Sequence, residues 1–162
     1  MPIVAVIAGS KSDLDYISPI EDLFKDFEIE YEVRIFSAHR SPEQTVKYVR
    51  SLERRGVKVV IAVAGYAAHL PGIVAAHCTI PVIGVPIDSS SLSGLDALLS
   101  IVQMPAGVPV GTMTIGQPGA RNAALYAISI LSTRDRRLRK ALKDYRKQLE
   151  DDIMKVNEEM LE

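Results

Sequence analysis

Residues 3–13 read IVAVIAGSKSD, and this stretch decides the fold. Its first six residues are apolar without alternation, which is typical of a strand covered on both faces, as in a parallel sheet. A glycine and small polar residues follow at once, and apolar residues then recur at helical spacing as far as residue 27. The stretch therefore predicts a buried parallel strand, a short polar loop and a helix.

The same unit, an apolar strand followed by a helical pattern, recurs along the chain. Further strands are expected at residues 31–36, 57–64, 81–87 and 108–115, and helices at 12–27, 42–55, 70–77, 94–103, 120–131 and 134–162. Alternating strands and helices give a parallel sheet with helices on both faces, because crossover connections are right-handed. We predict an α/β fold: a three-layer doubly wound sandwich, flavodoxin- or Rossmann-like, with about five parallel strands and a long C-terminal helix.

We predict a single domain over residues 1–162, with an α/β core (1–132) and a C-terminal helix (133–162). That helix carries a stripe of apolar residues at spacings of three and four: Leu138, Leu142, Tyr145, Leu149, Ile153, Val156 and Met160. The stripe lies either across the chain's own core or on another subunit, and we favour the subunit contact.

Composition excludes several classes of protein. The chain has 162 residues, 48% of them hydrophobic, and a formal net charge of −1. It lacks the concentrated basic face that nucleic acids and membrane surfaces attract. Cys78 is the single cysteine, so we expect no disulfide, no cysteine metal site and a reducing compartment. Since no targeting or membrane-spanning pattern is present, we expect a cytoplasmic protein.

Polar and small residues gather where the predicted strands end. They occupy residues 9–13, 37–40, 65–72, 88–91 and 116–117. Because parallel strands end at one edge of the sheet, and such sheets bind ligands there, these segments predict a binding site.

Residues 9–13 (GSKSD) admit two interpretations. Gly9 and the hydroxyls of Ser10 and Ser12 can hold a phosphate at a helix N-terminus, or the segment can simply carry an ordinary N-cap at Ser12 or Asp13. The pattern is neither a Walker loop nor GxGxxG, so ATP and NAD lack support. Asp13 is better suited to accept hydrogen bonds from sugar hydroxyls than to face a phosphate.

Residues 37–40 (SAHR) combine a hydroxyl, a histidine and an arginine. Arg40 suits a phosphate clamp, since a guanidinium is planar, bidentate and permanently charged. Histidine side chains exchange protons near neutral pH, so His39 is the leading candidate for a general acid/base. The alternative is a loop histidine bonded to backbone.

His69 ends a run of small residues. Gly65, Ala67 and Ala68 would let a flat ring lie close to backbone amides, while a structural histidine is the alternative. The three histidines lack the spacing of a zinc site, so we expect no metal. No G-x-S-x-G hydrolase elbow is present.

These loops resemble those of the N5-carboxyaminoimidazole ribonucleotide mutase (PurE, class I) family of purine biosynthesis. Six motifs match in order between about residues 4 and 131: GSKSD (9–13), SAHRSP (37–42), AAHLPG (67–72), GVP (84–86), SIVQMP (100–105) and GVPVG (107–111). The resemblance implies an isomerase that moves the carboxylate of its ribonucleotide substrate from the exocyclic nitrogen to carbon 4. It implies no cofactor, metal or ATP, and a homo-octamer with sites formed between subunits.

The resemblance also implies a role for each site residue. His39 matches the catalytic imidazole, Ser10, Ser12 and Arg40 match positions that hold the ribose phosphate, and Asp13 matches the one that grips the ribose hydroxyls. The pocket around the ring and the departing CO2 is matched by Ser37, Ala38, Gly65, Ala67, Ala68, His69 and Leu70.

One residue departs from the family pattern, which usually has glycine where this chain has Tyr66. Its side chain can point outward, stack on the ring or narrow the expected CO2 pocket. A sister branch carboxylates aminoimidazole ribonucleotide directly with CO2, but it usually has lysine after the histidine and lacks AAHLPG. Arg40 and His69 therefore favour the mutase. The direct carboxylase and a non-catalytic nucleotide-binding module are the alternatives.

Overall fold

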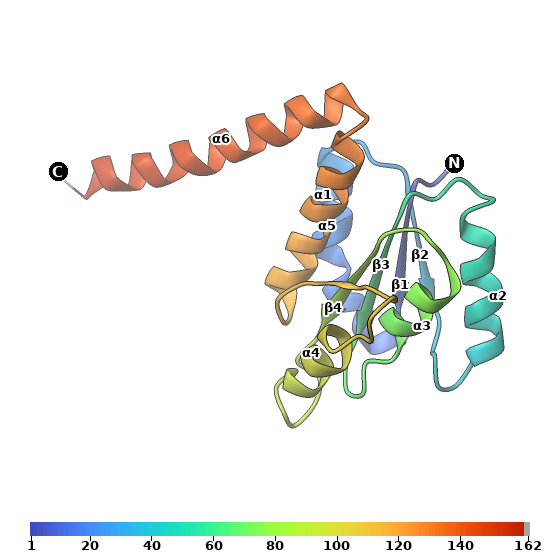
Figure 1. The fold of residues 1–162 in the computed structure, drawn as a ribbon. Coiled ribbons are helices and arrows are strands. Elements are labelled where there is room, and N and C mark those ends of the chain that lie inside the picture. The colour runs from blue at the N-terminus through green and yellow to red at the C-terminus, as the bar shows by residue number, and fades with distance from the viewer. Residues whose placement is uncertain (161–162) are drawn as a thin grey trace. The chain divides into compact units, whose positions relative to one another are not determined.

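A five-stranded sheet forms the centre of the fold (Figure 1). The structure is a computed structural model, and it describes residues 1–160. All strand pairs are parallel, in the order β2-β1-β3-β4-β5. The strands are β1 (Val4–Ala8), β2 (Tyr31–Ile35), β3 (Val59–Ala64), β4 (Val82–Pro86) and β5 (Gly111–Thr112). This order is the flavodoxin-like one, so the predicted α/β fold is confirmed.

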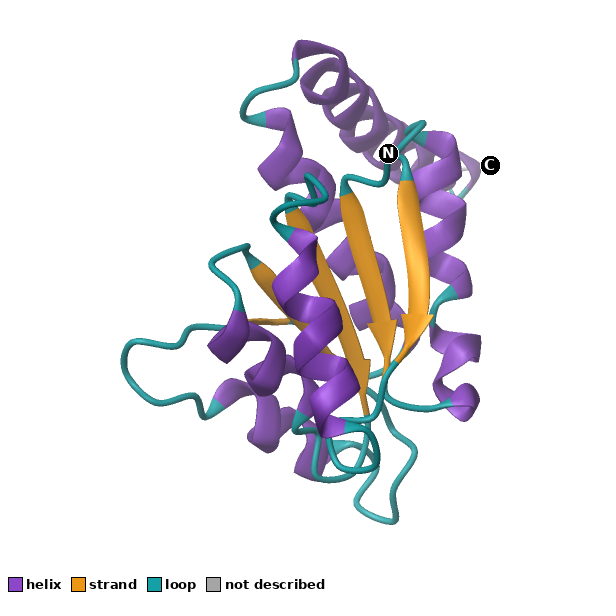
Figure 2. Ribbon diagram, turned by 90° about the vertical axis from the view of Figure 1, so that its right-hand side faces the viewer, coloured by secondary structure: helices purple, strands orange, loops and turns teal. Residues whose placement is uncertain are grey.

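Helices cover both faces of the sheet (Figure 2). The α-helices are α1 (Ser18–Asp26), α2 (Pro42–Leu52), α3 (Leu70–His77), α4 (Leu95–Val102), α5 (Gln117–Ser132) and α6 (Arg136–Glu159), of which α6 belongs to a separate compact unit. The turn after α2 ends at Gly56, whose φ of +84° is typical of a glycine that follows a helix.

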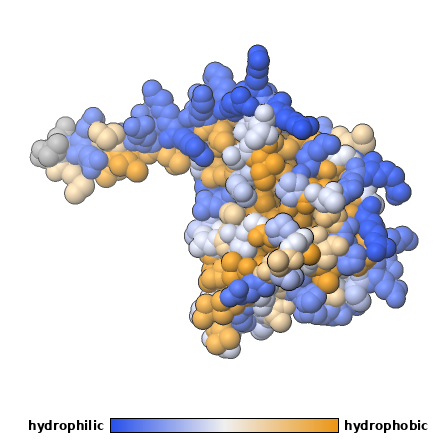
Figure 3. Space-filling view, in the orientation of Figure 1, coloured by the Kyte–Doolittle hydropathy of each residue, from blue (hydrophilic) through white to orange (hydrophobic). Residues whose placement is uncertain are grey.

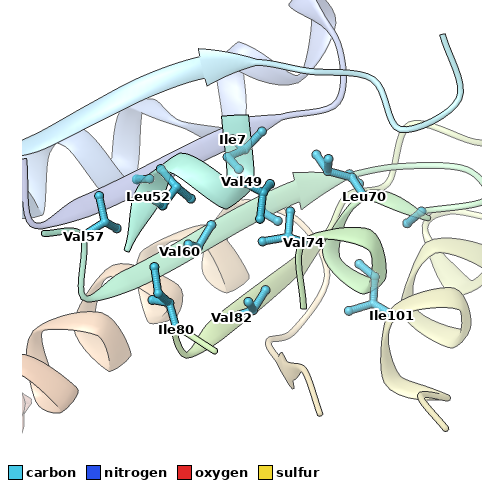
Figure 4. Close-up of a cluster of buried hydrophobic side chains, with 14 of the residues drawn as sticks. Ile7, Val49, Leu52, Val57, Val60, Leu70, Val74, Ile80, Val82 and Ile101 are labelled. Carbon is cyan, nitrogen blue, oxygen red and sulfur yellow. The ribbon is translucent and has the colours of Figure 1, made fainter. Parts of the chain in front are cut away.

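One cluster of buried side chains joins α2 and α3 to the sheet (Figure 4). Val49 and Leu52 of α2 and Val74 of α3 are fully buried, together with Ile7 of β1 and Val60 of β3. Burying a side chain of this size contributes about 1.5–3 kcal/mol. This packing fixes the helices, and with them the loops that precede α2 and α3.

The helix predicted over residues 12–27 is wrong in its first part. Residues Lys11–Tyr16 form a separate 3-10 helix, η1, and α1 begins only at Ser18. Pro19 explains the break, because a proline has no N–H to donate and its ring clashes with the carbonyl four residues earlier. Ser18 and Gln117 instead donate side-chain hydrogen bonds to that carbonyl, on Asp15.

The strand predicted over residues 108–115 is also wrong in its length. Only Gly111–Thr112 is strand, paired with Ile83 and Gly84 of β4 at the edge of the sheet. Pro109 lacks the N–H that a ladder requires, and Gly107 has a φ of +98° that no strand has. The longer apolar pattern therefore forms an extended loop with one short contact.

The chain divides into two compact units, residues 1–127 and residue 128 to the end. In the second unit, Asp135 caps α6 by accepting hydrogen bonds from the backbone N–H groups of Arg137 (2.8 Å) and Leu138 (3.1 Å). Early residues of the predicted stripe are buried, as Leu138 is, whereas later ones such as Ile153 and Val156 are exposed. The single domain and the subunit contact stay predictions. No helix within residues 1–160 is long and apolar enough to cross a membrane.

Candidate active site

The carboxyl ends of β1, β2 and β3 meet at one edge of the sheet, since Ala8 lies in register with Ile35 and with Val63. The loops that follow these strands enclose a pocket of about 440 Å³, which suits a small-molecule ligand. The connections from β1 to β2 and from β2 to β3 run in opposite directions here, and doubly wound sheets bind ligands at such a point. Every residue predicted for the site lines this pocket, together with Gly9, Ala64 and Tyr66.

The loop after β1 is organised by the carboxylate of Asp13, which is only 6% exposed. Its Oδ2 accepts from the backbone N–H of Ser10 (3.0 Å), and its Oδ1 accepts from the hydroxyls of Ser10 (2.8 Å) and Ser12 (3.1 Å). Ser10 is the N-cap of η1, so a cap is present, but not at Ser12 or Asp13, where the second interpretation placed it. A carboxylate offers about four acceptor positions, so Asp13 keeps one for a further donor.

The loop after β2 is a tight turn that places Arg40 beside the loop after β1. The hydroxyl of Ser37 accepts from the backbone N–H (3.1 Å) and from Nε (3.3 Å) of Arg40. Nη2 of Arg40 donates to the carbonyl of Gly9 at 3.5 Å. Ser41 then caps α2, and its carbonyl accepts from the buried Thr45 hydroxyl at 2.8 Å. The guanidinium therefore spans two of the three loops.

His39 and His69 face each other across the pocket from different loops. Their ring centroids are 5.4 Å apart, and the ring planes are inclined by 49°. His39 follows β2, and His69 is the residue before α3. Both side chains are exposed, and neither makes a hydrogen bond to any part of the chain that the structure describes. The backbone-bonded histidine that was the alternative for His39 is therefore not observed.

The loop after β3 brings backbone close to the pocket. A Cβ at Gly65 would lie 2.1 Å from Oγ of Ser89 and 3.0 Å from Cγ1 of Ile87, so a side chain there would force its neighbours to shift. Tyr66 has a φ of +54°, in the left-handed region, where a side chain costs roughly 1 kcal/mol or more. Its carbonyl accepts from the backbone N–H of Ala68 at 2.8 Å. Ala68 and Leu70 are both almost fully buried and give the pocket an apolar floor.

The charge of the pocket suits an anion. Arg40 has no carboxylate within ion-pairing distance among residues 1–160, and the two histidines add further donors beside it. Within the same residues, no group of three or more histidine, cysteine or acidic side chains is arranged to hold a metal ion. The arrangement can bind a phosphorylated, flat, polar molecule and exchange protons with it.

A contact that the sequence analysis missed supports this edge of the sheet. Tyr16 of η1 donates a hydrogen bond to Oδ1 of Asp88, in the loop after β4, at 2.6 Å. The bond to this carboxylate raises the pKa of Tyr16 to about 12, because deprotonation would place two anions side by side. The position of Asp88 directly after a strand signals its place at the edge. Nothing in the sequence signals its partner.

Comparison with known proteins agrees with the pocket. The AIR carboxylase family matches residues 3–152. The chain is 52% identical to the N5-carboxyaminoimidazole ribonucleotide mutase of Saccharolobus solfataricus, over 95% of this chain and 96% of that protein. It is 47% identical to the N5-carboxyaminoimidazole ribonucleotide mutase of Escherichia coli, over 93% of this chain and 89% of that protein. The solved structure of Treponema denticola PurE matches with a TM-score of 0.87 at 30% identity, covering 98% of each chain. On its sequence and its fold alike, the chain belongs to the AIR carboxylase family.

Proposed function

We propose that this protein is a purine-biosynthesis mutase that converts N5-carboxyaminoimidazole ribonucleotide into 4-carboxy-5-aminoimidazole ribonucleotide. One observation carries the proposal: His39, Arg40 and the Ser10–Asp13 hydrogen-bond network line a single pocket at the switch point of the sheet. The relatives support the same reaction, since proteins named as this mutase are 44–53% identical to the chain over 89–99% of its length.

The phosphate of the nucleotide is assigned to Arg40 and to the hydroxyls of Ser10 and Ser12. Arg40 lines the pocket and has no carboxylate partner among the described residues, and a phosphate would supply two acceptor oxygens for its planar fork. The free acceptor position on Asp13 then suits a ribose hydroxyl. This assignment leaves the heterocycle facing His39 and the loop after β3.

His39 is assigned the proton transfers. Breaking the bond from the exocyclic nitrogen to the carboxylate releases CO2 and requires a proton on that nitrogen, which the imidazolium of His39 supplies. Carbon 4 then bonds to the CO2 and gives up its own proton to the imidazole. The cycle balances without an oxidant, a reductant or a second substrate. His69, 5.4 Å away between ring centroids, lies beside the same reacting atoms.

The segment from Gly65 to Leu70 is assigned the task of holding CO2 between the two steps. Gly65 and Ala67 carry at most a methyl group and so let CO2 approach their backbone, while the buried side chains of Ala68 and Leu70 are apolar and exclude water. A captured CO2 reacts with the neighbouring ring far faster than one that diffuses away, because the second step is then effectively unimolecular.

The test is the reaction itself. We expect the purified protein to isomerise N5-carboxyaminoimidazole ribonucleotide without ATP, followed by the absorbance of the 4-carboxy product. The family's description favours a second candidate, direct carboxylation of aminoimidazole ribonucleotide. Supplying this compound with labelled bicarbonate beside the N-carboxylated nucleotide separates the two, according to which is consumed faster. Binding without turnover of either would contradict both and leave a non-catalytic nucleotide-binding module.

We also propose that the protein is a cytoplasmic homo-octamer in which the C-terminal helix packs on a neighbouring subunit. Large apolar side chains are exposed at α4 and just before it (Leu92, Leu95, Leu99 and Val102), and late in α6 and at its C-cap (Leu149, Ile153, Val156 and Met160). Figure 3 shows apolar surface gathered over α4. Exposed apolar patches of this kind mark contact surfaces. Light scattering should give eight times the chain mass, and a monomer would contradict the proposal.

A further inference from the structure

We propose that Tyr66 is a positioning residue that covers the bound heterocycle with its aromatic ring. The inference rests on the proposed function, because it needs a nucleotide in the pocket of the loops after β1, β2 and β3. Nothing in the proposed chemistry requires an aromatic residue at this place. Its presence therefore calls for a separate explanation.

The place of Tyr66 in the pocket is the first argument. Apart from the two histidines, it is the one aromatic side chain among the lining residues that the structure describes. Its neighbours Gly65, Ala67 and Ala68 carry at most a methyl group, so they offer a flat ring no face to stack on. Tyr66 lines the pocket and is 62% exposed, so a bound ring can displace water from its phenol.

The backbone of Tyr66 is the second argument. Its φ of +54° is unusual for a bulky residue, and a glycine would adopt it without strain. Such strain is often retained at ligand sites, because it holds a side chain where the ligand needs it. Ser93 has a similar φ of +51° in the loop before α4, outside the lining of this pocket, and serves as the matched control.

The third argument is that the side chain of Tyr66 has no polar or aromatic partner among the described residues. The phenol of Tyr66 makes no hydrogen bond within residues 1–160, and its ring has no aromatic partner there. Within residues 1–160 the fold therefore gains neither a hydrogen bond nor a ring contact from a side chain whose backbone is strained. A ring that stacks on the nucleotide and shields the CO2 from water gives the side chain its contact.

Four variants test this: Tyr66→Phe, Tyr66→Leu, Tyr66→Gly and Ser93→Gly. Calorimetry measures binding of 4-carboxy-5-aminoimidazole ribonucleotide and of ribose 5-phosphate, which lacks the heterocycle. We expect Tyr66→Phe and Ser93→Gly to bind the nucleotide as the wild type does, and the Leu and Gly variants to bind it about 2- to 10-fold more weakly. Ribose 5-phosphate should bind all of them equally. Both glycine variants should melt about 2–4 °C higher, since each relieves a positive φ.

Three results would overturn the inference. If the Leu and Gly variants of Tyr66 bind the nucleotide as tightly as the wild type does, the ring does not touch the heterocycle. An equal loss of ribose 5-phosphate affinity in these two variants means that Tyr66 merely shapes the loop. A wild-type protein that binds ribose 5-phosphate but not the nucleotide refutes the stacking while leaving a phosphate site. A wild type that binds neither compound refutes the proposed function itself.

Discussion

Two polar clusters of the α/β unit differ in how their charges are satisfied. In the first, Glu32 of β2 forms ion pairs with Arg34 (3.1 Å) and Arg55, and accepts a hydrogen bond from Tyr48 at 2.9 Å. In the second, the pocket, Arg40 donates only to a hydroxyl and a carbonyl among the described residues. The pocket histidines have no hydrogen-bond partner there.

The Glu32 cluster is complete without a ligand. The side chain of Glu32 is only 8% exposed, and each of its oxygens accepts from a neighbour. Burial and the bond to Glu32 raise the pKa of Tyr48, while Glu32 raises the pKa of Arg55. A cluster that satisfies its own charges stabilises the fold, whereas a cluster whose arginine has no carboxylate partner among the described residues can bind an anion from outside.

The largest effect is expected at the pocket's proton carrier. His39→Asn should lower kcat by about 10²- to 10⁴-fold, because the proton transfers lose their general acid/base, while nucleotide affinity changes little. The isomerisation assay and calorimetry measure the two quantities. His77→Asn is the matched control, since His77 lies at the end of α3 with Nδ1 2.9 Å from the carbonyl of Ile73. Near-normal turnover of His39→Asn would refute the assigned role.

The next largest effect is expected at Arg40, the arginine of the pocket. Arg40→Ala should raise KM about 10- to 100-fold, the equivalent of about 1.5–3 kcal/mol for a lost charge-assisted contact to phosphate. Steady-state kinetics measure it. The exposed Arg54 on the turn after α2 provides a control, and Arg54→Ala should leave KM unchanged. An unchanged KM in Arg40→Ala would show that this arginine does not bind the phosphate.

The Glu32 cluster should respond in the opposite way. Glu32→Gln should lower the free energy of unfolding by about 1–3 kcal/mol, because it leaves Arg34 and Arg55 without their anion. The values of kcat and KM should not change. Urea unfolding measures the loss. Asp22→Asn, which removes an exposed pair with Lys25, should cost less than about 1 kcal/mol. A Glu32→Gln variant with normal stability and altered kinetics would refute the claim that the Glu32 cluster serves stability and the pocket serves binding.

The smallest effect concerns Tyr16, which links η1 to the loop after β4. The pKa of Tyr16 is about 12 in the folded protein, against an ordinary value of 10. The folded state therefore binds this proton more tightly than the unfolded state does. The stability that results is present below pH 10 and is lost as the pH rises from 10 through 12. Tyr16→Phe should cost about 0.5–1.5 kcal/mol at pH 8, and the difference from the wild type should shrink above pH 10. Urea titrations at several pH values measure this. A difference that stays constant with pH would refute the coupling to Asp88.

Particular residues explain how far the sequence analysis reached. Unbroken apolar runs such as residues 3–8 predicted the buried strands, and the rule that parallel strands end together predicted which loops would meet. The analysis missed the break at Pro19 and the shortness of β5, because both depend on backbone N–H groups that an apolar pattern does not register. It named Tyr66 as a departure but gave no direction for its side chain.

The sequence by itself determined the alternation of strand and helix, and so the edge at which Ser10, His39 and His69 collect, because these follow from local periodicity and from the handedness of crossovers. Only the tertiary structure decided the 5.4 Å between the histidine rings, the reach of Arg40 to Gly9 and the bond from Tyr16 to Asp88. Such contacts join residues up to 72 positions apart. Side-chain directions across loops depend on packing of the whole chain, which no local pattern encodes.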